Sequence, residues 1–286
     1  MHYRFYMIGQ WLAQKLPLDA CYALAAFFGA AFYVFSHRDR EALKDNLRVV
    51  LGRHASKKNL NNCARMVYIN FAKYLVDFLK SPKLDAEYMK KNVVLQGREN
   101  IDIALDQNKG AILLSSHLGN WELGGAVVAS LGYKVNAIAL DHTEDKVTNF
   151  FIKQREKYGV RVIRIGAALK KCFLTLKRNE LLGILGDRDF SESGVKVKFF
   201  GRDTLIPKGP AFFSIRTAAP IVPTFVLRLR GCKHRIVFGK PFTFAASGNT
   251  EADIKKFVGK YIGVIQRQIR SHPSQWYLFR RVWGEK

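Results

Sequence analysis

From Val93 onward, short apolar runs alternate with stretches of helical length, and this alternation restricts the possible folds more than any other feature of the chain. Five such runs lie at residues 93–95, 111–114, 135–140, 160–163 and 181–185. Short apolar runs bounded by turn residues are typical of buried strands. Strands that alternate with helices predict a largely parallel sheet covered by helices on both faces. The expected fold class is therefore α/β, with a mixed, mostly parallel sheet flanked by helices.

Further elements are predicted on both sides of this alternating region. Before it, apolar residues at helical spacing predict helices around residues 43–51 and 60–78. After it, strand-like runs occupy residues 195–200, 221–230 and 235–238, and Gly231 predicts a hairpin between the last two. A final helix is expected at about residues 251–270.

The N-terminal 36 residues raise the question of a membrane. Residues 20–35 form a run of sixteen without a charge, preceded by Asp19 and followed by basic residues that begin at His37 and Arg38. A spanning helix needs about 17–25 residues, so this run is slightly short. Because no A-x-A-like cleavage site closes the run, we interpret it as a helix that lies in the membrane or barely spans it, with the basic residues on the cytoplasmic side. The alternative is a buried helix of a soluble domain. We expect two parts, an N-terminal membrane-anchoring or interfacial helix (1–36) and one α/β domain (37–286).

The chain is strongly basic, with a net charge of +24 spread over 286 residues. Such a charge favours phosphates, anionic lipid headgroups or acidic proteins as partners. Nucleic acid is the main rival, but the sequence contains no helix-turn-helix, RRM, zinc-finger or KH signature, so we expect no nucleic-acid partner. The four cysteines, Cys21, Cys63, Cys172 and Cys232, are widely spaced, which fits a reducing compartment and implies no metal.

The segment 111–125, AILLSSHLGNWELGG, places chemistry at the end of a strand. His117 follows the strand 111–114, Asn120 is the expected N-cap of the next helix, and Glu122 lies in its first turn. In open α/β sheets, ligands bind at this end of the strands. A carboxylate beside a histidine selects its tautomer and stabilises the imidazolium that forms when it removes a proton. We therefore predict that His117 is a general base and that Glu122 orients it, although a hydrogen-bonded loop histidine would explain the same letters.

A second polar group follows the strand 181–185, as Gly186-Asp187-Arg188-Asp189. Carboxyl ends of parallel strands meet at one edge of a sheet, so this group is expected to approach His117. Because Asp187 and Asp189 would point to opposite faces, only one of them is expected to reach the site. Asp187, Arg188 and Asp189 are candidate substrate-binding residues, and Arg188 offers donors suited to a phosphate. A surface cluster of acids and arginine is the alternative.

A helix is predicted to begin at Ile206-Pro207-Lys208-Gly209-Pro210. The N-terminus of a helix binds phosphate through its free N–H groups and its dipole, and Lys208 would add charge there. Lys208 and Gly209 are therefore candidate substrate-binding residues, and a plain helix-start loop explains them equally well.

Two of these segments resemble a known enzyme family. HLGNWELGG matches the H-x4-(D/E) motif of glycerolipid acyltransferases, in the branch of bacterial lipid A biosynthesis (lauroyl or myristoyl) acyltransferases, and also resembles mycobacterial phosphatidylinositol mannoside acyltransferases. Residues 186–223 resemble the same branch, which often has Asp-Gln or Asp-His where this chain has Asp187-Arg188. The DRD form is closer to the mannoside-acylating relatives. The resemblance also implies that Arg155 binds substrate, where a solvent-facing basic residue is the alternative.

The resemblance implies a membrane-associated O-acyltransferase of glycolipid or lipopolysaccharide biosynthesis, at the cytoplasmic face of the bacterial inner membrane. It would transfer a fatty acyl group from an acyl carrier protein or CoA thioester to a hydroxyl of a lipid A precursor or similar phosphorylated glycolipid, without a further cofactor. Alternatives are a phosphatidylinositol mannoside or lysophospholipid acyltransferase, and a non-catalytic basic protein that binds membranes or nucleic acid. Ser115 and Ser116 are not expected to be nucleophiles because no G-x-S-x-G motif surrounds them.

Overall fold

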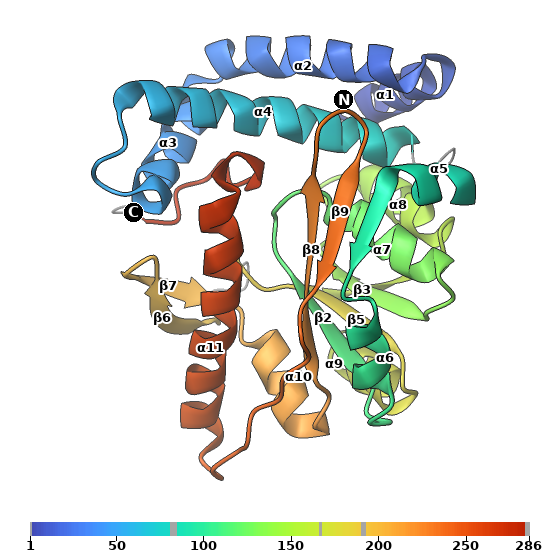
Figure 1. The fold of residues 1–286 in the computed structure, drawn as a ribbon, viewed down its shortest axis with the longest axis vertical. Coiled ribbons are helices and arrows are strands. Elements are labelled where there is room, and N and C mark those ends of the chain that lie inside the picture. Colours follow the sequence, from blue (N-terminus) through green and yellow to red (C-terminus); the bar gives the residue numbers. More distant parts are fainter. Residues whose placement is uncertain (1, 81–84, 166–167, 190–192, 284–286) are drawn as a thin grey trace.

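The computed structural model describes residues 2–80, 85–165, 168–189 and 193–283. Within these residues, seven strands form one sheet in the order β1-β9-β8-β2-β5-β3-β4 (Figure 1). They are β1 (Val93–Gln96), β2 (Ala111–Ser115), β3 (Val135–Ala139), β4 (Val160–Arg164), β5 (Leu181–Leu185), β8 (Ile221–Arg228) and β9 (His234–Phe238). All neighbours are parallel except the hairpin β8–β9. The predicted α/β class and the mostly parallel sheet are confirmed.

Two buried clusters cover the two faces of the sheet, because β2 alternates its side chains between them. Ile112 and Leu114 pack with α9 (Ala168–Lys177), α10 (Gly209–Thr217) and α11 (Thr250–Ser271). Ala111 and Leu113 pack on the other face with α6 (Glu99–Leu105) and α7 (Trp121–Ser130). In Figure 1, α11 and α7 accordingly lie on opposite sides of the central strands. The sheet is therefore buried on both faces, as its continuous apolar strands predict.

The strand β7 (Arg202–Ile206) was not predicted from the sequence. β6 (Val195–Phe199) pairs antiparallel with β7 (Arg202–Ile206) in a separate two-stranded sheet. Only Thr204 and Ile206 of β7 are buried, so its sequence, RDTLI, has too few apolar residues to reveal a strand. Phe200 and Gly201 join the strands with positive φ angles of 50° and 76°, as a tight hairpin turn requires.

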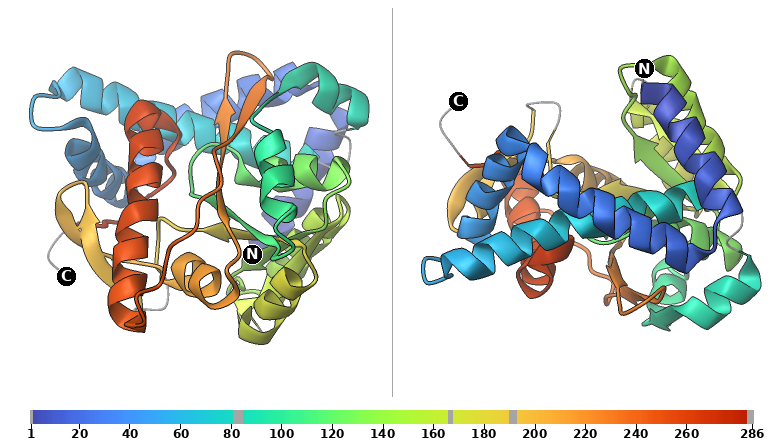
Figure 2. Two further views of the ribbon diagram at one scale, coloured as in Figure 1. Left: turned by 60° about the horizontal axis from the view of Figure 1, so that its bottom comes forward. Right: turned by 90° about the horizontal axis from the view of Figure 1, so that it is seen from above.

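The helices before the sheet form a layer across one end of it (Figures 1 and 2). They are α1 (His2–Lys15), α2 (Leu18–Phe35), α3 (His37–Leu51), α4 (Lys57–Lys80) and α5 (Ala86–Asn92). The N-terminal segment therefore contains two helices where the apolar run indicated one. Seen from above, α2 runs alongside α4 (Figure 2, right).

The contact between α2 and α4 depends on small side chains. Cys21, Ala25 and Gly29 are buried on the inner face of α2. At Gly29 an added Cβ would lie 2.9 Å from the carbonyl oxygen of Tyr68, so no larger residue fits without a shift. One face of α2 is thus buried against the protein between Cys21 and Gly29.

The four cysteines are free thiols. Burial raises the pKa of Cys63 to about 11 and that of Cys172 to about 12. These two thiols are therefore protonated at neutral pH and act as small apolar side chains.

Candidate active site

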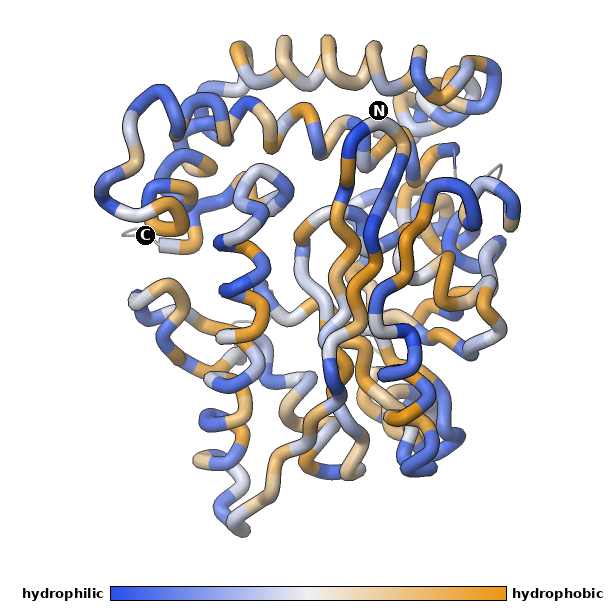
Figure 3. Tube along the Cα trace, in the orientation of Figure 1, coloured by the Kyte–Doolittle hydropathy of each residue, from blue (hydrophilic) through white to orange (hydrophobic). Residues whose placement is uncertain are grey.

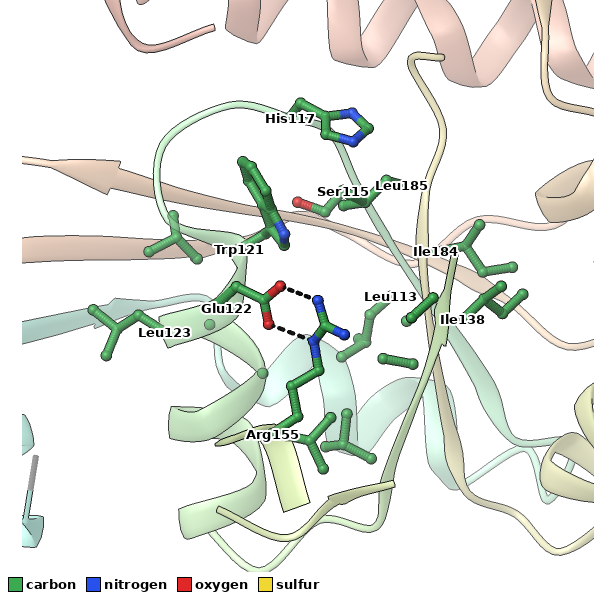
Figure 4. A pocket seen from close by; sticks show the side chains of 18 of the residues that line it. Leu113, Ser115, His117, Trp121, Glu122, Leu123, Ile138, Arg155, Ile184 and Leu185 are labelled. Atoms are coloured by element: carbon green, nitrogen blue, oxygen red, sulfur yellow. Dashed lines mark hydrogen bonds and ion pairs between the residues drawn. The ribbon is translucent and has the colours of Figure 1, made fainter. Parts of the chain in front are cut away.

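A cavity of about 580 Å³ lies against the face of the sheet that α7 covers (Figure 4). Its floor includes Leu113, Gly183 and Ala137, which are in register on the neighbouring strands β2, β5 and β3. Its other walls come from α7 and from α8 (Asp145–Glu156) and the residues that follow it. Most of the lining residues are apolar, so the cavity suits a hydrocarbon chain.

His117 lines this cavity, two residues beyond the end of β2. Ser115 of β2 is paired with Leu185 of β5, and the two chains continue side by side, since the Gly186 N–H donates to the Ser115 carbonyl oxygen at 2.9 Å. Position 117 therefore lies beside position 187. The expectation that the two polar segments converge at one edge of the sheet is confirmed.

The carboxylate at the His117 ring belongs to Asp187, and not to Glu122 as the sequence indicated. Nδ1 of His117 lies 2.9 Å from Oδ1 of Asp187, and the His117 backbone N–H donates to both oxygens at 3.1 Å. Burial raises the pKa of Asp187, but the His117 charge and the hydrogen bonds outweigh it, so the pKa lies below its ordinary value. Asp187 is therefore ionised at neutral pH, although it is only 2% exposed.

Glu122 instead forms an ion pair with Arg155 on α8 (Figure 4). Nε and Nη2 of Arg155 donate to the two Glu122 oxygens at 2.9 and 2.6 Å. Glu122 meets Arg155 because it lies in the first turn of α7, and α7 packs beside α8. Both side chains line the cavity, and the Arg155 guanidinium also lies over the Phe151 ring. The pair thus forms a charged part of an otherwise apolar wall.

The loop between His117 and α7 is held in a single conformation. Gly119 has a φ of 68°, and an added Cβ there would lie 1.7 Å from the Val226 carbonyl oxygen, so only glycine fits. Asn120 caps α7, as predicted, by accepting from the Leu123 N–H at 3.0 Å. Its side-chain amide donates to Asp77 at 2.8 Å.

Asp77 was not identified from the sequence. It lies on α4, is buried, and binds Arg228 of β8 and Tyr22 of α2 in addition to Asn120. Burial raises its pKa, but the Arg228 charge and the hydrogen bonds bring it below its ordinary value. The available signal was a single acid next to Phe78 on an apolar stripe, which requires a buried partner.

The remaining predicted site residues lie around the same cavity. Arg188, Asp189 and Gly209 line it, and Lys208 is the N-cap of α10. Burial and the nearby charge of Arg280 lower the pKa of Arg188. Asp189 accepts a hydrogen bond from the Gly194 N–H at 2.9 Å. Of the two aspartates, Asp187 binds the imidazole, and Asp189 lines the cavity.

Among the described residues, neither an activated serine nucleophile nor a metal site is formed. There, Ser115 and Ser116 are buried and their hydroxyls have no hydrogen-bond partner, so no base activates them. The same part of the chain contains no group of three His, Cys, Asp or Glu residues that could hold a metal ion. The geometry favours a histidine base held by Asp187 beside an apolar cavity.

Comparison with known proteins identifies the family to which the chain belongs. The family model described as bacterial lipid A biosynthesis acyltransferase matches residues 2–285. A phosphatidylinositol mannoside acyltransferase of Mycobacterium tuberculosis H37Rv is 26% identical over 266 residues, which cover 90% of this chain and 81% of the relative. A phosphatidylinositol mannoside acyltransferase of Mycolicibacterium smegmatis is 24% identical over 283 residues, covering 97% and 90%.

Proposed function

Because this chain belongs to the bacterial lipid A biosynthesis acyltransferase family and is an acyltransferase, we propose that it transfers a fatty acyl group from a thioester to a hydroxyl of a phosphorylated glycolipid, with His117 as the base. The observation that carries the proposal is the 2.9 Å contact between His117 Nδ1 and a buried, ionised Asp187 beside an apolar cavity. With Nδ1 held as the donor, Nε2 is the proton acceptor.

The proposed reaction needs no covalent enzyme intermediate. Nε2 removes the proton as the acceptor oxygen attacks the thioester carbonyl, and a tetrahedral intermediate forms. This intermediate collapses to an ester as the C–S bond breaks, and the departing thiolate takes the proton from the imidazolium. Asp187 stabilises the positive imidazolium between these two steps.

The substrates follow from the surroundings of the dyad. The acyl chain would occupy the cavity over Leu113, Gly183 and Ala137. Arg188 and the N-terminus of α10, with Lys208, would bind a phosphate of the acceptor or of the carrier thioester. Two cations as close as Arg188 and Arg280 repel each other, and a bound anion would relieve this repulsion. The donor is a CoA or acyl carrier protein thioester, and the acceptor is a mannosylated phosphatidylinositol or a lipid A precursor.

We further propose that α1 and α2 rest in the plane of the membrane. The outward side chains of α2 include Phe27, Phe28 and Phe35, which are 67%, 62% and 82% exposed, and Phe5 and Trp11 of α1 are also exposed. Figure 3 shows the apolar character along α2, and its length of 18 residues and mean hydropathy of 1.7 would permit a span. Because its other face packs along α4, a position parallel to the surface is favoured. Basic residues that follow α2, such as Arg38, would contact anionic lipid on the cytoplasmic side.

The decisive experiment compares purified wild-type protein with His117→Ala and Asp187→Asn. Each protein is incubated with radiolabelled palmitoyl-CoA or acyl carrier protein thioester and with a phosphatidylinositol mannoside, a lysophospholipid or a lipid A precursor. Wild type is expected to form a labelled ester with one acceptor class. Both variants are expected to lose roughly 10²- to 10⁴-fold in kcat. Equal turnover in the three proteins would contradict the proposal.

Association with the membrane is tested separately by sedimentation with vesicles of 30% anionic lipid. Replacing Phe27, Phe28 and Phe35 together by Ser should abolish binding without lowering the melting temperature, because these side chains are exposed. A variant that still binds, or a wild type that ignores the vesicles, would contradict an in-plane helix.

A further inference from the structure

The carboxylate of Asp187 has a third hydrogen-bond donor besides the ring and backbone of His117. Nε1 of Trp276 lies 2.9 Å from Oδ2, while the His117 ring lies at Oδ1. Each oxygen therefore has its own side-chain donor, and the His117 backbone N–H lies 3.1 Å from both. This arrangement fixes the plane of the carboxylate as well as its position.

Trp276 is held rigidly although it belongs to the C-terminal segment after α11. It forms an antiparallel bridge with Leu118, and the next residue, Tyr277, donates its N–H to the His117 carbonyl oxygen at 2.8 Å. The Trp276 side chain is 0% exposed and packs against Phe199 and Trp283. The indole N–H therefore has a fixed position beside Asp187, because Trp276 cannot move without disrupting the packing of the core.

An indole N–H is a permanent, neutral donor, unlike an imidazole. It stabilises the ionised carboxylate at every pH and holds Oδ1 toward Nδ1, which selects the tautomer that leaves Nε2 as the base. Because it binds the carboxylate, the indole N–H also weakens the attraction between Asp187 and the imidazolium. Two other titratable groups interact electrostatically with Asp187: Arg188, the next residue in the chain, and Tyr261 of α11. Burial, with the charges of Asp187 and Asp189, keeps the Tyr261 pKa well above its ordinary value, so Tyr261 stays neutral.

We propose that Trp276 is a positioning residue of the acyl-transfer reaction, which acts through Asp187 to orient His117 and to adjust its basicity. The inference rests on the proposed role of His117 as the base. It assigns a function to the C-terminal segment: to deliver one N–H group to a carboxylate that lies 89 positions earlier in the chain.

The chain provides a matched control in Trp283. This residue is also buried, its ring centroid lies 6.2 Å from that of Trp276, and its Nε1 donates to the Thr204 hydroxyl at 2.8 Å. Trp283→Phe therefore removes one buried indole hydrogen bond from the same aromatic cluster without touching Asp187. Any effect specific to Trp276→Phe reports on the carboxylate.

The kinetic experiment measures kcat, KM and the pH profile of kcat/KM for wild type and both variants. Trp276→Phe is expected to lower kcat about tenfold, as the loss of one hydrogen bond to a charged group predicts, with KM nearly unchanged. The acid limb of its profile should move to higher pH, because the freed carboxylate interacts more strongly with the imidazolium. Trp283→Phe should leave the profile in place. Equal losses of kcat in both variants, or a loss of kcat without a shift of the acid limb, would show that Trp276 contributes only to core packing.

A second measurement uses the wild-type protein and needs neither turnover nor a stable Trp276 variant. The chain contains four tryptophans. In protein labelled with ¹⁵N-tryptophan, the Trp276 indole signal is assigned by difference from Trp11→Phe, Trp121→Phe and Trp283→Phe. It should titrate with the same midpoint as the ¹⁵N signal of the His117 ring, assigned with His117→Ala. A pH-independent Trp276 signal would overturn the inference, whereas absent acyl transfer with a titrating signal would reject only the proposed function.

Discussion

At the scale of single residues, the site separates two carboxylates into two roles. Asp187 is hydrogen-bonded to the His117 imidazole, and Glu122 is paired with Arg155 through two short hydrogen bonds. The H-x4-E spacing therefore identifies a site without identifying which acid meets the histidine. That choice depends on which neighbouring element each side chain faces.

The Glu122–Arg155 pair should be strongly coupled because both side chains are largely buried. Removing one partner, as in Arg155→Met or Glu122→Gln, leaves an unmatched polar group and should lower the free energy of unfolding by about 3–5 kcal/mol. The double variant should lose clearly less than the sum of the two. Urea denaturation of the four proteins measures this coupling.

The exposed pair Arg164–Asp141 is the control for this cycle, since its side chains are 52% and 43% exposed. Its coupling should be only about 0–1 kcal/mol. Additive losses at Glu122 and Arg155 would show that the pair is no stronger than an ordinary surface contact.

Acid should destabilise the protein through Asp77 and Asp187. The pKa of each is lowered in the folded state, so their stabilisation is complete above the unfolded pKa, near 3.9, and is lost as the pH falls through the lower folded value. The free energy of unfolding should therefore fall steeply below about pH 4. Urea unfolding at a series of pH values measures the slope, which should be shallower in Asp187→Asn. An unchanged slope in this variant would show that Asp187 has the same proton affinity in both states.

At the scale of elements, the register of three strands creates the space for substrate. Leu113, Gly183 and Ala137 lie side by side, and two of these three residues are small. A Cβ added at Gly183 would meet only ordinary contacts, at 3.7 Å or more. The cavity therefore exists because Gly183 and Ala137 have small side chains and because α7 and α8 cover the space above them.

This geometry predicts a change in the preferred acyl chain. Ala137→Leu adds three carbons to the floor and should shift the preference toward donors shorter by about two to four methylenes, at up to about 0.8 kcal/mol for each displaced methylene. Competition between C10, C12, C14 and C16 thioesters measures the preference, and retained turnover of the shortest donor shows that the site is intact.

The same substitution on the exposed face of α5, Ala86→Leu, should leave the preference unchanged. An unchanged preference in Ala137→Leu as well would mean that the acyl chain lies elsewhere.

At the scale of the whole molecule, distant segments meet at the catalytic loop. The C-terminal segment that carries Trp276 is fastened to α3 by Asn46, whose amide donates to the carbonyl oxygens of Leu278 and Arg280 and whose oxygen accepts from the Val282 N–H. Asp77 joins α4 to Asn120 beside His117, and to Tyr22 of α2. The helices before the sheet and the residues after it therefore belong to one cooperative structure with the site.

Asn46→Ala tests this connection. Loss of three hydrogen bonds at a fully buried side chain should cost about 2–4 kcal/mol of unfolding free energy. It should also lower kcat, because Trp276 belongs to the same segment. Asn59→Ala, at an exposed position of α4, should change the free energy of unfolding by less than about 0.5 kcal/mol. Similar losses in the two variants would contradict the role of Asn46 as the fastening residue.

The sequence by itself determined most strands of the main sheet and the edge of the sheet where its polar residues gather, although it did not reveal β7 or the division of the N-terminal segment into α1 and α2. Apolar periodicity, turn residues and the N-cap Asn120 are local signals, and the strands that end before His117 and Gly186 were predicted nearly to the residue. Parallel pairing then places those two ends at the same edge of the sheet. The family was also recognisable from two ordered motifs.

Only the tertiary structure decided which groups touch. Asp187 and Trp276 lie 70 and about 160 positions from His117, and no local pattern links them. Their contacts depend on the register between β2 and β5 and on where the C-terminal segment packs. In the same way, the apolar run of α2 did not reveal that one of its faces packs against α4. A side chain's partner depends on the packing of separate elements, which local propensity does not encode.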